Sequence, residues 1–212
     1  MSTPPSARSV KIGENERTGW SSERPRREGG PARPVDVSVR NTLLRPSDRL
    51  RYSPGSLLLV TGARAAGLDR LLARVIEERG IVFTPAKVRA LLSGRVPEDQ
   101  IGARTDELIR TAVAKRMAAG ETAVVALPDI DPATRRTFVE LAHAHRRPRH
   151  LLMVEAPNDS VADDERRVLA ELRRALTAGE LGAEGFHTSI RFAGNALVEL
   201  KKIVFRPAPA DE

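Results

Sequence analysis

Short, mostly apolar runs alternate with longer amphipathic segments from residue 56 onward. Short apolar runs are typical of strands buried on both faces of a parallel sheet, and apolar residues at helical spacing are typical of helices with one buried face. The pattern predicts strands over residues 56–60, 81–83, 122–127, 150–156 and 186–192. It predicts helices over residues 68–80, 85–94, 104–119, from 132 onward, 163–179 and 196–204.

Strands and helices alternate five times, and this alternation predicts a parallel sheet with helices on both of its faces. In sheets of this kind, ligands bind at the carboxyl ends of the strands. The residues expected at that edge are 61–69, 83–89, 126–131 and 156–159.

Several helix ends and one helix face can also be predicted. Gly80 is expected to end the first helix and Pro85 to open the second, because glycine favours helix ends and proline the first turn. Asp131 is expected to cap the helix that begins at Pro132. The inner stripe of the helix over 104–119 is expected to be Leu108, Ile109, Ala112, Val113, Arg116 and Met117.

Composition excludes several classes of protein. Aromatic residues make up 3% of the 212 residues, so the core must be aliphatic, and there is no cysteine for disulfides, thiolate metal sites or a thiol nucleophile. No apolar run is long enough to cross a membrane, and the first residues contain no apolar signal core. We therefore expect a cytoplasmic protein with no membrane partner.

Charge divides the chain into a tail and a body. The net charge is +7, and residues 1–55, with 11 Lys/Arg and 6 Asp/Glu, carry +5 of it. Residues 1–45 read as a disordered basic tail rich in Pro and Arg, residues 46–206 as the folded domain and residues 207–212 as a flexible end. The tail is either simply solvated or a contact for nucleic acid or an acidic protein. Four apolar residues are expected to dock the lead-in to the domain: Leu43, Leu44, Leu50 and Tyr52.

The loop after the first strand has the glycine spacing of a phosphate-binding loop. Gly62 and Gly67 are separated by four residues, but the lysine and hydroxyl positions that complete the motif hold Leu68 and Asp69. Losing that lysine removes the charge that neutralises a nucleotide's phosphates, and Arg64 is the candidate substitute cation. The alternative interpretation is a strand-to-helix turn that merely needs two glycines.

Four segments, the first of which contains this loop, give it a context. They are SLLLVTGARAAG (56–67), FTPAKVRALL (83–92), the run from 112 to 145 and the run from 165 to 192. In order and spacing they resemble the P-loop kinase module of bacterial polynucleotide kinase-phosphatases. The resemblance covers residues 56–205 and implies an α/β, P-loop NTPase-like three-layer sandwich with a five-stranded, mostly parallel sheet.

The departures from that family fall on residues that carry chemistry. Besides Leu68 and Asp69, the family's acceptor-side base falls on Ala86, and the aspartate that ends its third strand falls on Ala126. An alanine cannot accept a proton from an acceptor hydroxyl. The family's arginine-rich lid is shortened here, with only Arg166 or Arg167 as candidates to reach inward.

Two arginines and one aspartate remain as candidates for binding. The resemblance implies that Arg89 and Arg135 lie on the acceptor side, where they could hold an anion. Asp129 is a weak candidate for a displaced metal ligand, and otherwise no metal is expected. His143, His145 and His150 are interpreted as part of a solvated basic turn.

Three functions are compatible with these residues. The first is a non-catalytic P-loop pseudokinase that acts as a binding or regulatory module, with no cofactor. The second is a divergent kinase that uses ATP and Mg²⁺ on a nucleic-acid 5′-hydroxyl or a small-molecule hydroxyl, with Arg64 or Lys87 as cation and Asp69 or Asp129 as metal ligand or base. The third is an assembly or adaptor protein that binds an unknown protein or nucleic acid through its basic tail.

Overall fold

The computed structural model describes residues 49–127 and 129–206. The predicted tail over 1–45, the C-terminal residues 207–212, and Leu43 and Leu44 of the lead-in lie outside the described residues.

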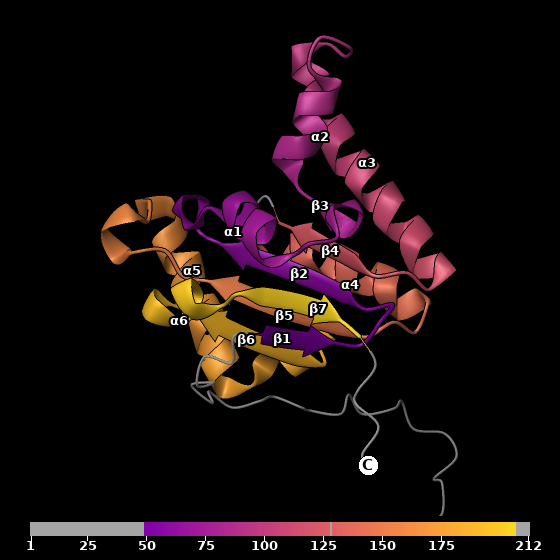
Figure 1. Cartoon of the computed structure of the whole chain (residues 1–212). Helices are drawn as coiled ribbons and strands as arrows, with labels where there is room; N and C mark the ends of the chain where they lie inside the picture. Colours follow the sequence, from indigo (N-terminus) through magenta and orange to yellow (C-terminus); the bar gives the residue numbers. More distant parts are fainter. Residues whose placement is uncertain (1–48, 128, 207–212) are drawn as a thin grey trace, which may run out of the picture. The chain divides into compact units, whose positions relative to one another are not determined.

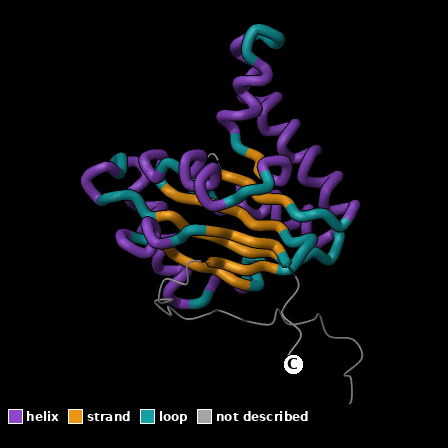
Figure 2. The backbone as a smooth tube through the Cα atoms, viewed as in Figure 1, coloured by secondary structure: helices purple, strands orange, loops and turns teal. Residues whose placement is uncertain are grey.

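The main sheet has five strands in the order β3-β4-β2-β5-β6, and every neighbouring pair is parallel (Figures 1 and 2). This confirms the predicted α/β class and the five predicted strands. The strands are β2 (Leu57–Gly62), β3 (Val82–Phe83), β4 (Ala123–Ala126), β5 (Arg149–Val154) and β6 (Thr188–Phe192).

Three helices cover one face of the sheet. Alternate residues of a strand point to opposite faces, so Leu57 and Leu59 of β2 face the same way and pack into one core with these helices. They contribute, for example, Val113, Phe138 and Leu172. The helices are α3 (Glu98–Ala119), α4 (Pro132–Ala144) and α5 (Asp163–Ala178).

The opposite face of the sheet is covered by a helix and a second, two-stranded sheet. Leu58 and Val60 of β2 pack here with α1 (Leu68–Val75) and with the parallel strands β1 (Arg49–Tyr52) and β7 (Lys202–Phe205). The short helix α6 (Gly194–Glu199) precedes β7. The result is three layers, with the main sheet in the middle.

The remaining elements connect these layers. Helix α2 (Pro85–Leu92) contains no buried residue; it is opened by Pro85 as expected, and the Thr84 side chain accepts a hydrogen bond from the Lys87 amide. Four single 3₁₀ turns complete the part of the chain that the structure describes: η1 (Arg64–Ala66), η2 (Arg79–Ile81), η3 (Asn158–Ser160) and η4 (Glu180–Gly182).

The prediction of a last helix over 196–204 is wrong for the second half of that range. The helix ends at Glu199, and residues 202–205 form β7. Ile203 is buried beside Leu50 of β1. In β1 the buried residues Leu50 and Tyr52 alternate with the exposed residues Arg49 and Arg51. Pairing with a strand from the other end of the domain overrides the local helical pattern.

Two other helix predictions also need correction. Helix α1 ends at Val75 rather than at Gly80, because Ile76 adopts extended backbone angles and is buried. Helix α3 begins at Glu98, and Leu108, predicted to face inward, is 47% exposed. The inner stripe instead runs through Ile101, Thr105, Ile109, Val113 and Met117 at intervals of four.

The strand order determines where a ligand would bind. β2 lies between β4 and β5, and the chain builds one side of the sheet before crossing β2 to build the other. A crevice opens at the carboxyl end of a strand where the order reverses in this way, and here that strand leads into the glycine loop. No helix in the described part of the chain is long and apolar enough to cross a membrane.

Candidate phosphate-loop site

A cavity of about 450 Å³ lies above the loop that follows β2. Its floor is the loop and the first turn of α1, and its walls are the start of α2 and the end of β4. The cavity brings together most of the predicted site residues: Gly62, Arg64, Gly67, Leu68, Asp69 and Arg89. Arg135 and Asp129 do not line it.

The two glycines of the loop are required by the backbone. A Cβ on Gly62 would lie 2.4 Å from the carbonyl oxygen of Val154, its partner residue on β5. Gly67 has a φ of 62°, in the left-handed region, and α1 begins at the next residue. The glycine spacing therefore serves the turn from strand to helix, whether or not a phosphate is bound.

Two amides of this loop are already hydrogen-bonded within the protein. The amide of Ala66 donates to the Ala63 carbonyl at 2.8 Å. The amide of Arg64 donates to Oε1 of Glu165, on the first turn of α5, at 2.9 Å. Phosphate loops bind their ligand through backbone amides, so a carboxylate here occupies a donor that a phosphate would use.

The Arg64 side chain is engaged by the same helix. Its Nη2 donates to both carboxylate oxygens of Asp164, at 2.8 and 2.7 Å, and its Nε lies 3.6 Å from Glu165 Oε1. The hydrogen bond to Asp164, followed by the charges of Asp164 and Glu165, raises the pKa of Arg64. The Glu165 side chain is only 12% exposed, whereas Arg64 is 64% exposed. We call Arg64, Asp164 and Glu165 the acidic clamp.

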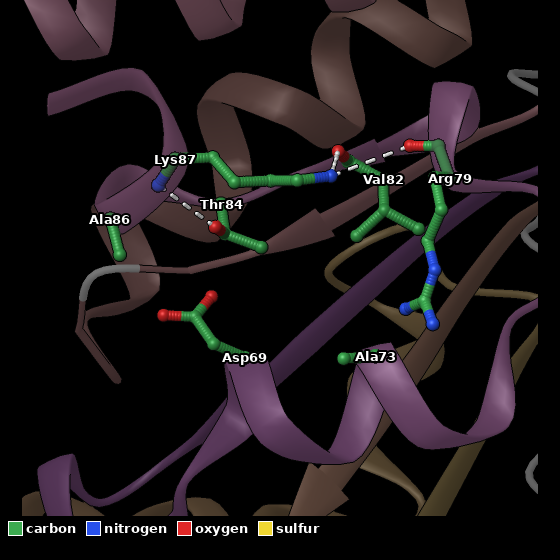
Figure 3. A pocket seen from close by; sticks show the side chains of 7 residues that line it. All are labelled: Asp69, Ala73, Arg79, Val82, Thr84, Ala86 and Lys87. Carbon is green, nitrogen blue, oxygen red and sulfur yellow. Dashed lines mark hydrogen bonds between the residues drawn. The ribbon is translucent and has the colours of Figure 1, made fainter. Parts of the chain in front are cut away.

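Leu68 and Asp69 separate at the start of α1. Leu68 packs partly buried against the core beneath the helix, so it supplies neither charge nor polarity to the cavity. Asp69 is exposed, and its carboxylate extends toward Thr84 and Ala86 across the gap between α1 and α2 (Figure 3). A negative charge therefore stands where a phosphate loop has its hydroxyl.

Arg89 and Arg135 have different surroundings. Arg89 is exposed on α2 and lines the cavity, next to Ala86 in the family's base position. The Arg135 side chain is 3% exposed; it donates from Nε and Nη2 to the Glu184 carboxylate, at 3.0 and 2.8 Å, and from Nη1 to the Ile130 carbonyl. Arg135 is thus bound inside the protein, and we leave it out of the proposed binding site.

Asp129 and Asp131 organise the start of α4. Asp131 caps the helix as predicted, accepting from the Ala133 amide at 2.9 Å. Both carboxylate oxygens of Asp129 accept hydrogen bonds as well, from the Asp131 amide and from Oγ1 of Thr134. Within the described residues, no group of three His, Cys, Asp or Glu side chains is placed to hold a metal ion.

His150 does not lie in a solvated turn. It is 7% exposed, and its Nδ1 lies 2.7 Å from Oγ1 of Thr188 on the neighbouring strand. Burial, with the nearby His187 and Arg149, lowers its pKa to about 4. Its Nε2 and the Tyr52 hydroxyl are buried without a hydrogen-bond partner among the described residues, and the two rings lie 4.5 Å apart.

Sequence reasoning missed the acidic clamp. Acidic residues are common in the first turn of a helix because they complement its dipole, so the acidic residues at 163–165 do not by themselves indicate a contact with the loop. Arg166 and Arg167, the candidates from the shortened lid, pair instead with Asp163 and Glu171 of their own helix. The only local signal was an acidic stretch in place of the family's basic lid.

The sheet order and the glycine loop define a P-loop NTPase-like α/β fold. No protein-family model and no curated protein matches the chain. Solved structures with some likeness include a candidate kinase from Chloroflexus aurantiacus (14% identity, TM-score 0.41, 66% of this chain and 85% of that one). Others are APE1195 (12%, 0.42, 70% and 91%) and the Deinococcus radiodurans tunicamycin resistance protein (17%, 0.37, 69% and 91%). We draw no conclusion from similarities this low, and the fold is assigned from the strand order and the glycine loop of this chain.

Proposed function

We propose that this chain is a non-catalytic, P-loop kinase-like protein that acts as a binding or regulatory module. The observation that carries the proposal is the hydrogen bond from the Arg64 amide to Glu165. This hydrogen bond occupies a backbone donor of the loop, in a site that already lacks the lysine and the hydroxyl because Leu68 and Asp69 stand at those positions. Phosphoryl transfer depends on positioning and charge stabilisation, and here the cation, the metal hydroxyl and a loop amide are all lost to the reaction.

Two of the four substitutes that a divergent kinase would need, Arg64 and Asp129, are engaged within the protein. Arg64 is bound by Asp164, whereas Nζ of Lys87 has only 3.5 Å contacts with the carbonyl oxygens of Arg79 and Val82. Asp129, the candidate metal ligand, is bonded to the start of α4. These contacts support the non-catalytic proposal over the kinase alternative.

Calorimetry on the full-length chain tests the proposal. ATP and GTP are titrated with and without Mg²⁺, and turnover is then assayed with a 5′-hydroxyl oligonucleotide as acceptor. We expect no heat at submillimolar nucleotide and no phosphorylated product. Mg²⁺-dependent turnover that disappears in Arg64→Ala would overturn the proposal in favour of a divergent kinase. Loss of cellular function on deleting residues 1–45, with cavity variants silent, would favour the adaptor alternative.

A further inference from the structure

A second cavity adjoins the one above the loop. Its volume is about 570 Å³, and it lies between α1 and the segment that joins β3 to α2 (Figure 3). The two cavities share Asp69 and Ala86 in their linings, so they adjoin along α1 and α2, and we call them together the α1–α2 groove.

The α1–α2 groove carries an excess of positive charge that the protein does not neutralise. Arg70 and Arg89 line the first cavity, and Arg79 and Lys87 line the second. All four are exposed, and in the described part of the chain none has a carboxylate within ion-pairing distance. Lys87 reaches only two carbonyl oxygens, at 3.5 Å. An anionic ligand would therefore meet cations whose charge is still available.

The charges in the groove follow a pattern. Among the described residues, Asp69 is the carboxylate in the lining of both cavities, and besides the paired Arg64 each lining holds two cations, Arg70 and Arg89 in one and Arg79 and Lys87 in the other. A complementary ligand thus carries an anionic group, then a hydrogen-bond donor, then another anionic group. The small side chains of Ala73 and Ala86 leave room for a polypeptide backbone to approach.

We propose that the α1–α2 groove binds an extended acidic peptide of a partner protein, with acidic side chains on either side of a hydrogen-bond donor that faces Asp69. This rests on the proposed function as a binding module and names the chemistry of its partner. Nucleic acid fits less well, because no aromatic side chain lines either cavity to stack a base. A phosphodiester strand, charged at every nucleotide, would also set a phosphate against Asp69.

Fluorescence anisotropy on the full-length chain tests this. The probes are a short fluorescein-labelled peptide of repeating Glu-Gln-Glu triplets, an all-Glu peptide of equal length and an oligothymidylate of equal length. We expect the triplet peptide to bind most tightly and its affinity to fall as salt is added. Arg89→Glu and Arg79→Glu should each weaken it about tenfold. Arg136→Glu, an exposed arginine on α4 outside the groove, is the matched control and should change it little.

Asp69→Asn tests the charge pattern itself, since it should strengthen binding of the all-Glu peptide more than that of the triplet peptide. Tighter binding of oligothymidylate, equal losses in Arg136→Glu and Arg89→Glu, or no peptide binding would each overturn the inference. ATP calorimetry on the same preparation separates the two proposals. Failed peptide binding without nucleotide binding refutes only the acidic peptide, whereas Mg²⁺-dependent turnover refutes the non-catalytic function.

Discussion

The backbone amide of Arg64 donates a hydrogen bond to the carboxylate of Glu165, a residue 101 positions later in the chain. The loop after β2 thereby holds an anion that belongs to the protein itself. α5 is tied to the phosphate-loop edge of the sheet by the same contact, so the acidic clamp has both a structural and a functional consequence.

Replacing Glu165 with alanine should lower the free energy of unfolding by about 1–2 kcal/mol, because a nearly buried, charge-assisted hydrogen bond to the amide is lost. Asp163→Ala is the matched control. It removes a carboxylate from the same helix turn, but its side chain is 91% exposed and pairs with Arg166 of the same helix. We expect a loss of about 0.5 kcal/mol or less there. Urea denaturation measures both, and equal losses would show that the clamp adds no stability.

Restoring the motif should not restore nucleotide binding unless the acidic clamp is also opened. The double variant Leu68→Lys, Asp69→Ser regains the lysine and hydroxyl, but the Arg64 amide remains bonded to Glu165. We expect it to give no heat with submillimolar MgATP, and the triple variant with Glu165→Ala to bind. Asp163→Ala in place of Glu165→Ala serves as the control. Equal binding by the double and triple variants would contradict a blocking role for Glu165.

Gly62→Ala should destabilise the domain by about 2 kcal/mol or more, because its Cβ would meet the Val154 carbonyl oxygen at 2.4 Å. Gly67→Ala has open space around it, so its cost, about 1 kcal/mol, comes from the left-handed backbone alone. Gly102→Ala, in the interior of α3, also meets nothing and should stabilise by about 0.5–1 kcal/mol. Thermal unfolding should rank the three in this order, and a silent Gly62→Ala would contradict the close approach.

Arg135→Ala should cost about 3 kcal/mol of stability, since it removes a buried guanidinium from the Glu184 carboxylate and from the Ile130 carbonyl. The neighbouring Arg136, exposed on the same helix, should cost less than about 0.5 kcal/mol when changed to alanine. Urea denaturation distinguishes the two. A stable Arg135→Ala protein with altered anion binding would instead favour the acceptor-side role that the family resemblance implies.

Acid should destabilise the protein through His150. Burial lowers the folded-state pKa of His150 from 6.5 to about 4, so above about pH 6.5 the ring is neutral in both the folded and the unfolded state and does not oppose folding. As the pH falls from about 6.5 to 4 the unfolded chain takes up the proton first, and about 3 kcal/mol is lost. The pKa of the neighbouring His187 is also lowered by burial and adds in the same direction.

Unfolding free energies measured against pH check this. His150→Leu should flatten the acid limb, whereas His143→Leu, at an exposed position, should leave it unchanged. An unchanged acid limb in His150→Leu would show that other groups carry the acid sensitivity.

The central sheet was predictable because strands buried on both faces leave apolar runs that need no partner to be recognised, such as Leu57–Val60. β1 and β7 were not, because each is four residues long and each becomes a strand only beside the other. The local pattern of apolar and polar residues does not indicate a partner strand that lies so far away in the sequence.

The same limit applies to the site. The glycine spacing, the loss of the motif's lysine and hydroxyl at Leu68 and Asp69, and the helix cap at Asp131 could all be predicted from the sequence. The partners of Arg64 and Arg135 were not, because Glu165 and Glu184 lie 101 and 49 residues away from them. The sequence does not show which residue lies next to a charged side chain in the fold. An arginine that forms an internal ion pair therefore cannot be distinguished in the sequence from an arginine that binds a ligand.

The pairing of β1 with β7 bears on how the domain is made. Arg49 lies beside Lys202 and Tyr52 beside Phe205, so a strand from the start of the domain is completed only by residues from its end. During synthesis Leu50 and Tyr52 emerge early and have no cover until Ile203 follows, and contacts between such distant segments form slowly. A ribosome that stalls before residue 202 would hold a sheet with one face covered only in part, by α1, and the rest of that face would be open to water and to any chaperone that recognises apolar strands.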